Sequence, residues 1–395
     1  MLIGFCVSRF ARLSASPGSL YTYTADTLPP VFGVAAGWGL LLAYLATACS
    51  VAGGALYYAN LLSQQFLHWT PPVLVTIIAV CIAAGFVAYR DVKLSAELML
   101  WIEICSVSLI CIVLTVMPVR FGFHPDMDQF RLRGVSFANL GPALVLSMFS
   151  FVGFESATTL GGETRNPLRT IPRAVIQCAV LAGIFFVLCS YSEVLGFRGE
   201  SGKLSDTTSP LHLLAARAGV SPLGTAIDFG AFVSMIACVL ACVTAASRVL
   251  LRMARERLIP SIFERTNRQH GTPVAAVMLS TILVFVTTAA LSVRGISGSD
   301  VYDLLGSLAV FGFLSAYALV AAALPFARRA RGQHSHFLAA ASFAAILVVV
   351  LIAVFDLRST ADSAHARLPY IYLIYIAVAL AWYAGRRKPA VAIGA

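Results

Sequence analysis

Long apolar runs separated by short polar segments follow one another along the whole chain. Because an α-helix rises 1.5 Å per residue, about 20 apolar residues cross a bilayer core of roughly 30 Å. We predict ten membrane-spanning helices, at residues 31–59, 72–89, 94–118, 137–160, 171–197, 223–254, 273–293, 301–327, 337–355 and 369–385. Residues 1–7 are apolar but too few to cross, and we expect them to be the end of a longer helix. The short alternating segments of a membrane β-barrel are absent, so the sequence predicts an all-α membrane protein.

The composition also indicates a membrane protein. Hydrophobic residues make up 59% of the chain and charged residues 12%, whereas a typical soluble domain has about 25% charged residues. The formal net charge is +10, which by itself would suit nucleic-acid binding. The basic residues lie between the apolar runs, however, so they indicate membrane topology, and we expect no nucleic-acid partner.

The positions of the basic residues predict an orientation. If residues 8–30 are cytoplasmic, ten crossings place 19 of the 28 Arg and Lys residues on the cytoplasmic side. This bias follows the positive-inside rule. We therefore expect a multi-pass protein of the cytoplasmic membrane, with residues 386–395 as a cytoplasmic tail.

Motifs typical of soluble enzymes are absent. The nine cysteines are scattered, mostly within apolar runs and without a CxxC pair, and the seven histidines lie in or beside predicted loops. HExxH, P-loop and GxGxxG motifs do not occur. We expect neither enzymatic activity, nor a cofactor, nor a metal site.

One apolar run contains a carboxylate. Residues 147–174 read SMFSFVGFESATTLGGETRNPLRTIPRA, and Glu155 closely follows a Val-Gly pair. A free carboxylate in the middle of a bilayer costs at least a few kcal/mol, so Glu155 must face protein, water or a partner. One interpretation is an interrupted helix whose freed main-chain groups bind a substrate or an ion, as in secondary transporters. The alternative is that Glu155 lies near the inner membrane edge and pairs with an arginine such as Arg165 or Arg169.

Several segments resemble the amino acid-polyamine-organocation (APC) superfamily of permeases. FSFVGFESATTLGGETRNPLRTIPRA resembles the sixth-helix signature of that family, which is close to F-[SA]-F-x-G-[FW]-[ED] followed by E-x-x-N-P-x-R-x-x-P. AASRVLLRMARERLIP at 245–260 is similar to the end of its eighth helix, and NRQHGTPVAAV at 267–277 to the entry of its ninth. RLSASPGSLYTY at 12–23 and VKLSAELMLWIE at 92–103 resemble the turn after its second helix and the start of its fifth. The likeness spans nearly the whole chain.

The resemblance implies a LeuT-like transporter fold, in which two inverted five-helix repeats, with helices one and six broken, precede two further helices. In this register the chain is N-terminally truncated and lacks the first helix and most of the second. We then expect the end of helix two and a cytoplasmic loop at 1–30, helices three to five of an incomplete first repeat at 31–118, helices six to ten of the second repeat at 137–327, and helices eleven and twelve at 337–385.

The resemblance also implies a substrate site at the sixth helix. The residues that would line it are Phe149, Ser150, Phe151, Val152, Gly153, Phe154, Glu155 and, on the eighth helix, Cys242. Main-chain groups at the break would meet the charged ends of the ligand. Ordinary packing is the alternative for Phe149 and Gly153, as it is for Cys242 and the nearby Cys238. Weaker candidates are three small residues of the third helix, Ala43, Thr47 and Ala48.

Other carboxylates lie in or beside apolar runs. Lys93 and Glu97 are four positions apart, so an ion pair on one helix accounts for both. Glu103 lies deeper and needs a cationic partner or a proton. Glu193 and Asp228 are expected near the outer interface, in contact with water.

The function implied by the resemblance is secondary transport of amino acids or related amines by alternating access. A small-molecule substrate and the lipid bilayer are the expected partners. Coupling to H⁺ or Na⁺ and substrate exchange all stay open, because the predicted fifth helix has no lysine between Lys93 and Arg120 of the kind that some proton-coupled relatives are thought to use. A membrane enzyme is disfavoured, since the loop histidines do not group with other catalytic residue types. The remaining alternative is a truncated, non-transporting remnant or membrane assembly partner of the same fold.

Overall fold

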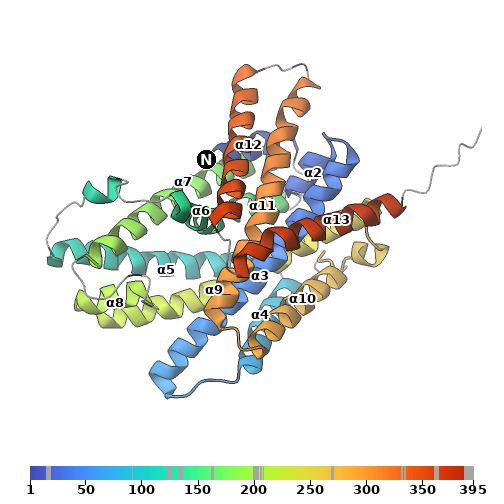
Figure 1. Ribbon diagram of the computed structural model, residues 1–395. Coiled ribbons are helices and arrows are strands. Elements are labelled where there is room, and N and C mark those ends of the chain that lie inside the picture. Colours follow the sequence, from blue (N-terminus) through green and yellow to red (C-terminus); the bar gives the residue numbers. More distant parts are fainter. Residues whose placement is uncertain are drawn as a thin grey trace, which may run out of the picture.

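Helices make up almost all of the described chain (Figure 1). The computed structural model describes residues 1–14, 19–90, 92–121, 127–131, 137–161, 164–198, 204, 207, 209–267, 271–330, 332, 335–359 and 364–386, and these contain no strand. The α-helices are α1 (Leu2–Ala11), α2 (Ser19–Ala25), α3 (Pro30–Leu67), α4 (Val73–Arg90), α5 (Val92–Phe121), α6 (Phe137–Phe151), α7 (Pro167–Gly196), α8 (Pro210–Arg217), α9 (Ser221–Arg255), α10 (Val274–Val293), α11 (Gly298–Arg329), α12 (His336–Ser359) and α13 (Leu368–Arg386). Short 3-10 helices are η1 (Met127–Phe130), η2 (Phe154–Leu160), η4 (Ser261–Glu264) and η5 (Ala364–Arg367).

The helices follow the predicted apolar runs. Within the described residues, nine helical segments are long and apolar enough to cross a bilayer. The tenth predicted run forms α4, whose apolar part Val73–Tyr89 is shorter than the other nine. Helices α3 and α7 each begin with a proline. The first N–H groups of an α-helix have no partner within the helix, so a residue without an N–H loses no hydrogen bond there. Most of the predicted tail, 387–395, lies outside the described residues.

Helices α3 and α11 form the centre of the molecule, and α9 also packs against α3 (Figure 1). In the apolar segments of α3 and α11, 67% of the residues are buried inside the structure. In the other seven spans this share is 6–33%. A Cβ added to Gly312 would lie 2.5 Å from the carbonyl oxygen of Gly39, and one added to Gly298 would lie 2.6 Å from that of Gly53. Glycine therefore lets the two backbones touch, as small residues do at many helix contacts in membranes.

A second, smaller apolar cluster surrounds α8. Val113 of α5 and Leu214 of α8 are fully buried members of this cluster. Arg217 donates a 3.1 Å hydrogen bond to the carbonyl oxygen of Gly196, and its guanidinium carbon lies 5.1 Å from the centre of the Phe197 ring. Helix α8, which falls between two predicted spans, is thus fixed to the ends of α5 and α7 and to the start of α9.

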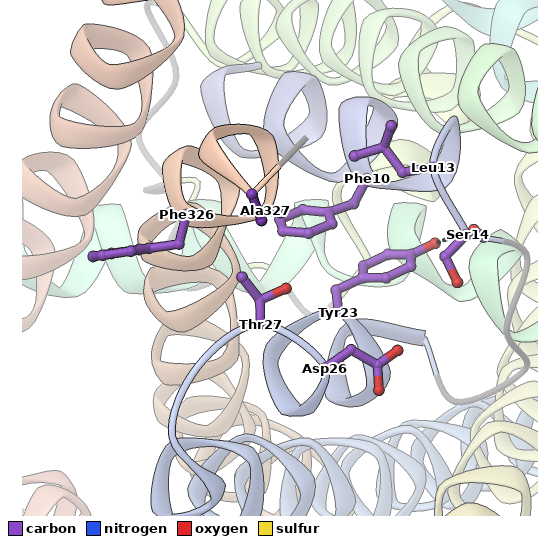
Figure 2. A pocket seen from close by; sticks show the side chains of 9 residues that line it. Phe10, Leu13, Ser14, Tyr23, Asp26, Thr27, Phe326 and Ala327 are labelled. Carbon is purple, nitrogen blue, oxygen red and sulfur yellow. Dashed lines mark hydrogen bonds between the residues drawn. The ribbon is translucent and has the colours of Figure 1, made fainter. Parts of the chain in front are cut away.

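The N-terminal helices α1 and α2 belong to the same packed structure. Helix α1 contacts α7, α11 and α12, and α2 contacts α3 and α11. The rings of Phe10 and Tyr23 stack with their centroids 5.1 Å apart. Beside them lies a cavity of about 250 Å³, which Asp26 and Phe326 also line (Figure 2).

Candidate functional site

The helix interruption expected near Gly153 is present. Helix α6 ends at Phe151 and η2 begins at Phe154, with a turn at Val152 and Gly153 between them. Gly153 has a φ of 102°, a conformation that residues with a Cβ adopt only under strain. A Cβ at this position would meet no atom within 4 Å. Glycine is therefore required here by the backbone conformation and not by crowding.

Glu155 connects the break to the central helices. Its side chain is 0% exposed. Oε2 accepts hydrogen bonds from the N–H of Gly153 at 3.1 Å and from the hydroxyl of Tyr317 on α11 at 2.7 Å. Oε1 accepts a 3.2 Å bond from the hydroxyl of Tyr44 on α3. These three donors compensate a carboxylate that has lost its contact with water, and they fix the start of η2 between α3 and α11.

Aromatic rings surround this carboxylate. The ring centroids of Tyr44 and Phe313 are 5.4 Å apart, and those of Phe154 and Tyr317 are 5.6 Å apart. A buried tyrosine hydroxyl needs a hydrogen-bond partner, and Glu155 serves both tyrosines. The apolar rings keep water away, and in such a low dielectric each hydrogen bond to the carboxylate is stronger than it would be in water.

The alternative of an arginine partner for Glu155 does not hold in this structure. Arg165 and Arg169 are both exposed. The partners that the described part of the chain provides to the carboxylate are two hydroxyl groups and one main-chain amide. Glu155 therefore lies inside the helix bundle, away from both arginines.

The other residues predicted for the substrate site point in different directions. Phe149 is 7% exposed, and its ring centroid lies 5.6 Å from that of Tyr302 on α11. The ring centroid of Phe151 lies 5.3 Å from that of Phe186 on α7. Ser150 is exposed and donates a 3.1 Å bond to a carbonyl oxygen of its own helix. The structure thus gathers the residues just after the break around the carboxylate, while Phe149 and Phe151 before the break contact the rings of Tyr302 and Phe186.

Comparison with known proteins identifies the family. The family model described as Amino acid permease matches residues 1–385. The chain belongs to this family. It is 26% identical over 345 residues to the branched-chain amino acid permease BcaP of Bacillus subtilis (strain 168), which covers 82% of this chain and 70% of that protein. It is 25% identical over 346 residues to the methylthioribose transporter of the same organism, with 83% of this chain and 71% of that protein covered.

The fold comparison agrees with the family. The crystal structure of MhsT in complex with L-phenylalanine is similar to this permease with a TM-score of 0.52 and 16% sequence identity, over 96% of this chain and 88% of that chain. This likeness confirms the LeuT-like fold expected from the sequence. The family and its relatives are transporters and not enzymes, so the permease is a multi-pass membrane transporter.

Cys242 lies in the core of the permease, on α9. It is 8% exposed and belongs to the same apolar cluster as Phe149. A cavity of about 120 Å³ lies between η2 and α9, and Ser156, Thr159 and Ala241 are among the residues that line it. The two segments that the resemblance assigns to the substrate site therefore meet beside a cavity, although the cavity lies against the residues that follow Glu155.

Sequence reasoning missed the two tyrosines that bind Glu155. The weaker candidates on α3, Ala43, Thr47 and Ala48, are all buried. Thr47 donates its hydroxyl to the carbonyl oxygen of Ala43 at 2.8 Å, so it is satisfied within α3. The available signal was the presence of Tyr44 and Tyr317 inside long apolar runs, since a hydroxyl in such a place must find a polar partner.

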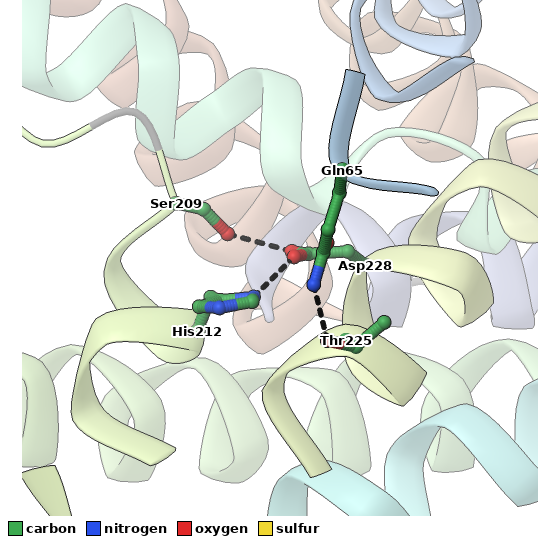
Figure 3. Close-up of polar contacts among 5 residues, drawn as sticks. All are labelled: Gln65, Ser209, His212, Thr225 and Asp228. Atoms are coloured by element: carbon green, nitrogen blue, oxygen red, sulfur yellow. Dashed lines mark hydrogen bonds and ion pairs between the residues drawn. The ribbon is translucent and has the colours of Figure 1, made fainter. Parts of the chain in front are cut away.

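The surroundings of Asp228 differ from those expected from the sequence. We expected it to contact water, but it is 1% exposed because α8 covers it. Ser209 donates a 2.6 Å bond to its Oδ1, and Nδ1 of His212 lies 2.6 Å from its Oδ2 (Figure 3). Nearby, Gln65 at the end of α3 donates to the hydroxyl of Thr225 at 2.9 Å. The cluster closes one wall of an open cavity of about 580 Å³ between α3, α8 and α9.

Glu103 has a hydroxyl partner on a neighbouring helix. Ser234 of α9 donates a 2.7 Å bond to its Oε2. A Cβ added to Gly230 would lie 2.7 Å from Oγ of Ser106, which shows how closely α5 and α9 approach. The side chain of Lys93 lies outside the described residues, so its expected pairing with Glu97 stays a prediction.

Proposed function

We propose that the permease is a secondary transporter that moves amino acids or related amines across the cytoplasmic membrane by alternating access, with its C-terminus on the cytoplasmic side. Transport would be coupled to H⁺ or Na⁺ or would proceed by exchange. The observation that carries this proposal is the break between α6 and η2, with the buried Glu155 bound to α3 and α11. Interrupted helices inside a membrane bundle are the usual substrate and ion sites of secondary transporters.

The substrate would bind at the end of α6. The proposed lining residues are Phe149, Ser150, Phe151, Val152, Gly153, Phe154, Glu155 and Cys242. The last carbonyl groups of an α-helix lack partners within the helix and carry partial negative charge, which suits the ammonium group of an amino acid or amine. The N–H of Gly153 already donates to Glu155, so a substrate carboxylate would need other donors.

Gly153 is the position at which the proposed alternating access would change the angle between the two segments. The segment before the break contacts α7 through Phe151. The segment after the break is bound through Glu155 to Tyr44 and Tyr317 of the central helices. Both segments also pack on α7 and α11, and they are joined at Gly153. A change of angle there would therefore shift the segment after the break against α6.

The test is uptake of radiolabelled amino acids and amines into proteoliposomes that contain the purified permease. We expect saturable uptake that responds to an imposed H⁺ or Na⁺ gradient or to substrate loaded inside the vesicles. Glu155→Gln should lose most of this uptake, because an amide cannot accept all three of the present hydrogen bonds on equal terms. Glu97→Gln makes the same chemical change at an exposed position and should retain uptake. Equal uptake by the parent protein and Glu155→Gln would contradict the proposed site, and no uptake of any amino acid or amine would contradict the proposed substrate class.

A further inference from the structure

A cavity of about 160 Å³ lies where α3, α9 and α13 meet near their ends. Its lining residues are Val34, Trp38, Glu256, Arg257, Leu258, Trp382 and Tyr383. Glu256 and Arg257 directly follow the span that ends at Arg255, and Trp382 lies in the last turns of the span that ends at Gly385. The cavity is therefore at the level of the lipid headgroups of one leaflet, where Trp and Tyr side chains are enriched in membrane proteins.

The lining offers a carboxylate and aromatic side chains. Glu256 is only half-buried, and it accepts a hydrogen bond from the hydroxyl of Tyr21 and pairs at 2.8 Å with Nε of Arg252. A carboxylate has about four acceptor positions, so Glu256 retains acceptor capacity toward the cavity. Trp faces attract cations through their π electrons, and Trp38 and Trp382 both line the space. This combination suits an ammonium group.

Arg257 places a positive charge at the same cavity, and its backbone conformation is strained. Its φ is +59°, in the left-handed region. Its N–H bonds to the carbonyl oxygen of Ala254 at 2.8 Å, and that of Leu258 bonds to Met253 at 2.9 Å. This is a helix-ending motif in which glycine is the favoured residue at the left-handed position. Strained residues gather at functional positions, and the exposed Arg257 side chain is available to an anionic group.

An apolar stripe leads away from the cavity along α13. Ile374, Val378 and Trp382 are spaced four residues apart, which places them on one helix face. Their exposed fractions are 64%, 64% and 51%. An acyl chain attached to a group in the cavity would lie along this stripe toward the middle of the bilayer, so the source of the headgroup is a lipid rather than a soluble amine.

We propose that this cavity binds the headgroup of an ethanolamine phospholipid, with its ammonium between Glu256 and the tryptophan rings and its phosphate on Arg257. A choline headgroup has no N–H to donate to the carboxylate, and a glycerol headgroup has no cation for the rings. The ethanolamine headgroup supplies both the ammonium and the phosphate that the two ends of the site require. The bound lipid would join the start of α3 to the end of α13.

The experiment measures the apparent melting temperature of the purified full chain in detergent. Phosphatidylethanolamine, phosphatidylcholine and phosphatidylglycerol with identical acyl chains are added at equal mole fractions, and free phosphoethanolamine forms a fourth arm. We expect phosphatidylethanolamine to raise the melting temperature by several degrees more than the other three additions. The readout is thermal stability and not uptake. A negative result would therefore contradict the lipid site without contradicting the proposed transport function.

Variants locate the effect. Arg257→Gly relieves the left-handed strain, so without lipid it should be at least as stable as the parent protein, yet it should lose the ethanolamine-specific shift. Trp382→Leu should also lose that shift. Arg294→Gly removes an exposed arginine that follows the last residue of α10 and has an ordinary φ of −74°, and it should retain the shift.

Four outcomes would overturn the proposal. Equal shifts with all three lipids would mean general solvation by lipid, and a larger shift with phosphatidylglycerol would mean an anion site. Retention of the ethanolamine preference in Arg257→Gly would place the lipid elsewhere. An equal shift with free phosphoethanolamine would identify a soluble ligand in place of a lipid.

Discussion

The hydroxyl of Tyr317 donates a 2.7 Å hydrogen bond to Oε2 of Glu155, which lies 162 positions earlier in the chain. This bond joins the interrupted helix to α11, and the weaker bond from Tyr44 joins it to α3. The carboxylate is fully buried, so its hydrogen bonds are the means by which its burial is tolerated. The relationship explains why an acidic residue stands in an apolar run.

Removing the Tyr317 hydroxyl should destabilise the protein more than removing that of Tyr44. Tyr317→Phe leaves a buried carboxylate without its shortest donor, which costs about 1–3 kcal/mol. Tyr44→Phe removes a bond of 3.2 Å and should cost less. Thermal unfolding in detergent measures both variants, and Tyr375→Phe is a control because its hydroxyl binds the main-chain oxygen of Trp38. A larger cost for Tyr44→Phe would show that the distances do not rank the two bonds.

Substitution of Gly153 should depend on backbone conformation and not on side-chain volume. Its φ of 102° is unfavourable for residues with a Cβ, and space around the position is open. Gly153→Ala should therefore cost about 1–2 kcal/mol. Gly153→Asn should cost less although its side chain is larger, because asparagine tolerates positive φ better than most residues. The melting temperatures of the two variants test this order, and a result that follows side-chain size would contradict it.

The polar cluster at Asp228 should hold α8 in place. Asp228→Asn cannot accept from Ser209 and His212 as the carboxylate does, and the loss should be about 1–3 kcal/mol. The effect should be local, with faster hydrogen exchange of the amides of residues 211–217. Asp300→Asn is the control, since that carboxylate makes an exposed bond with Ser297 and should change stability little. Unchanged exchange in Asp228→Asn would mean that the apolar cluster alone holds α8.

Glu256 should make stability fall as the pH rises. Burial raises the pKa of this carboxyl above its ordinary value of 4.5, with Arg252, Arg257 and Tyr21 as its charged and titratable neighbours. A raised pKa means that the folded protein holds the proton more tightly than the unfolded chain, so the contribution is fully present below pH 4.5 and is lost as the pH rises through the folded pKa. The melting temperature of the parent protein relative to that of Glu256→Gln should decline as the pH rises from 4.5 through the folded pKa of Glu256. A relative increase would show that the pairing with Arg252 outweighs burial.

Much of the fold was predictable from hydropathy. Each predicted run corresponds to a described helix, because a helix that crosses a bilayer needs about 20 apolar residues in succession. The interruption was predictable as well, since Gly153 and Glu155 are both unsuited to a continuous helix in lipid. Helix α8 was missed because it is short and lies between spans, where no lipid requirement shapes its sequence.

The sequence by itself determined the approximate limits of the apolar helices, the place of the break and the family. Local composition controls these features, because bilayer thickness and backbone conformation act on neighbouring residues. The tertiary structure decided which residues satisfy the buried carboxylates: Tyr44 and Tyr317 for Glu155, and Ser209 and His212 for Asp228. It also decided that α3 and α11 form the centre, through glycine contacts between positions far apart in the chain. Such partners are chosen by how the helices pack against one another, and the periodicity of one helix does not specify its neighbour.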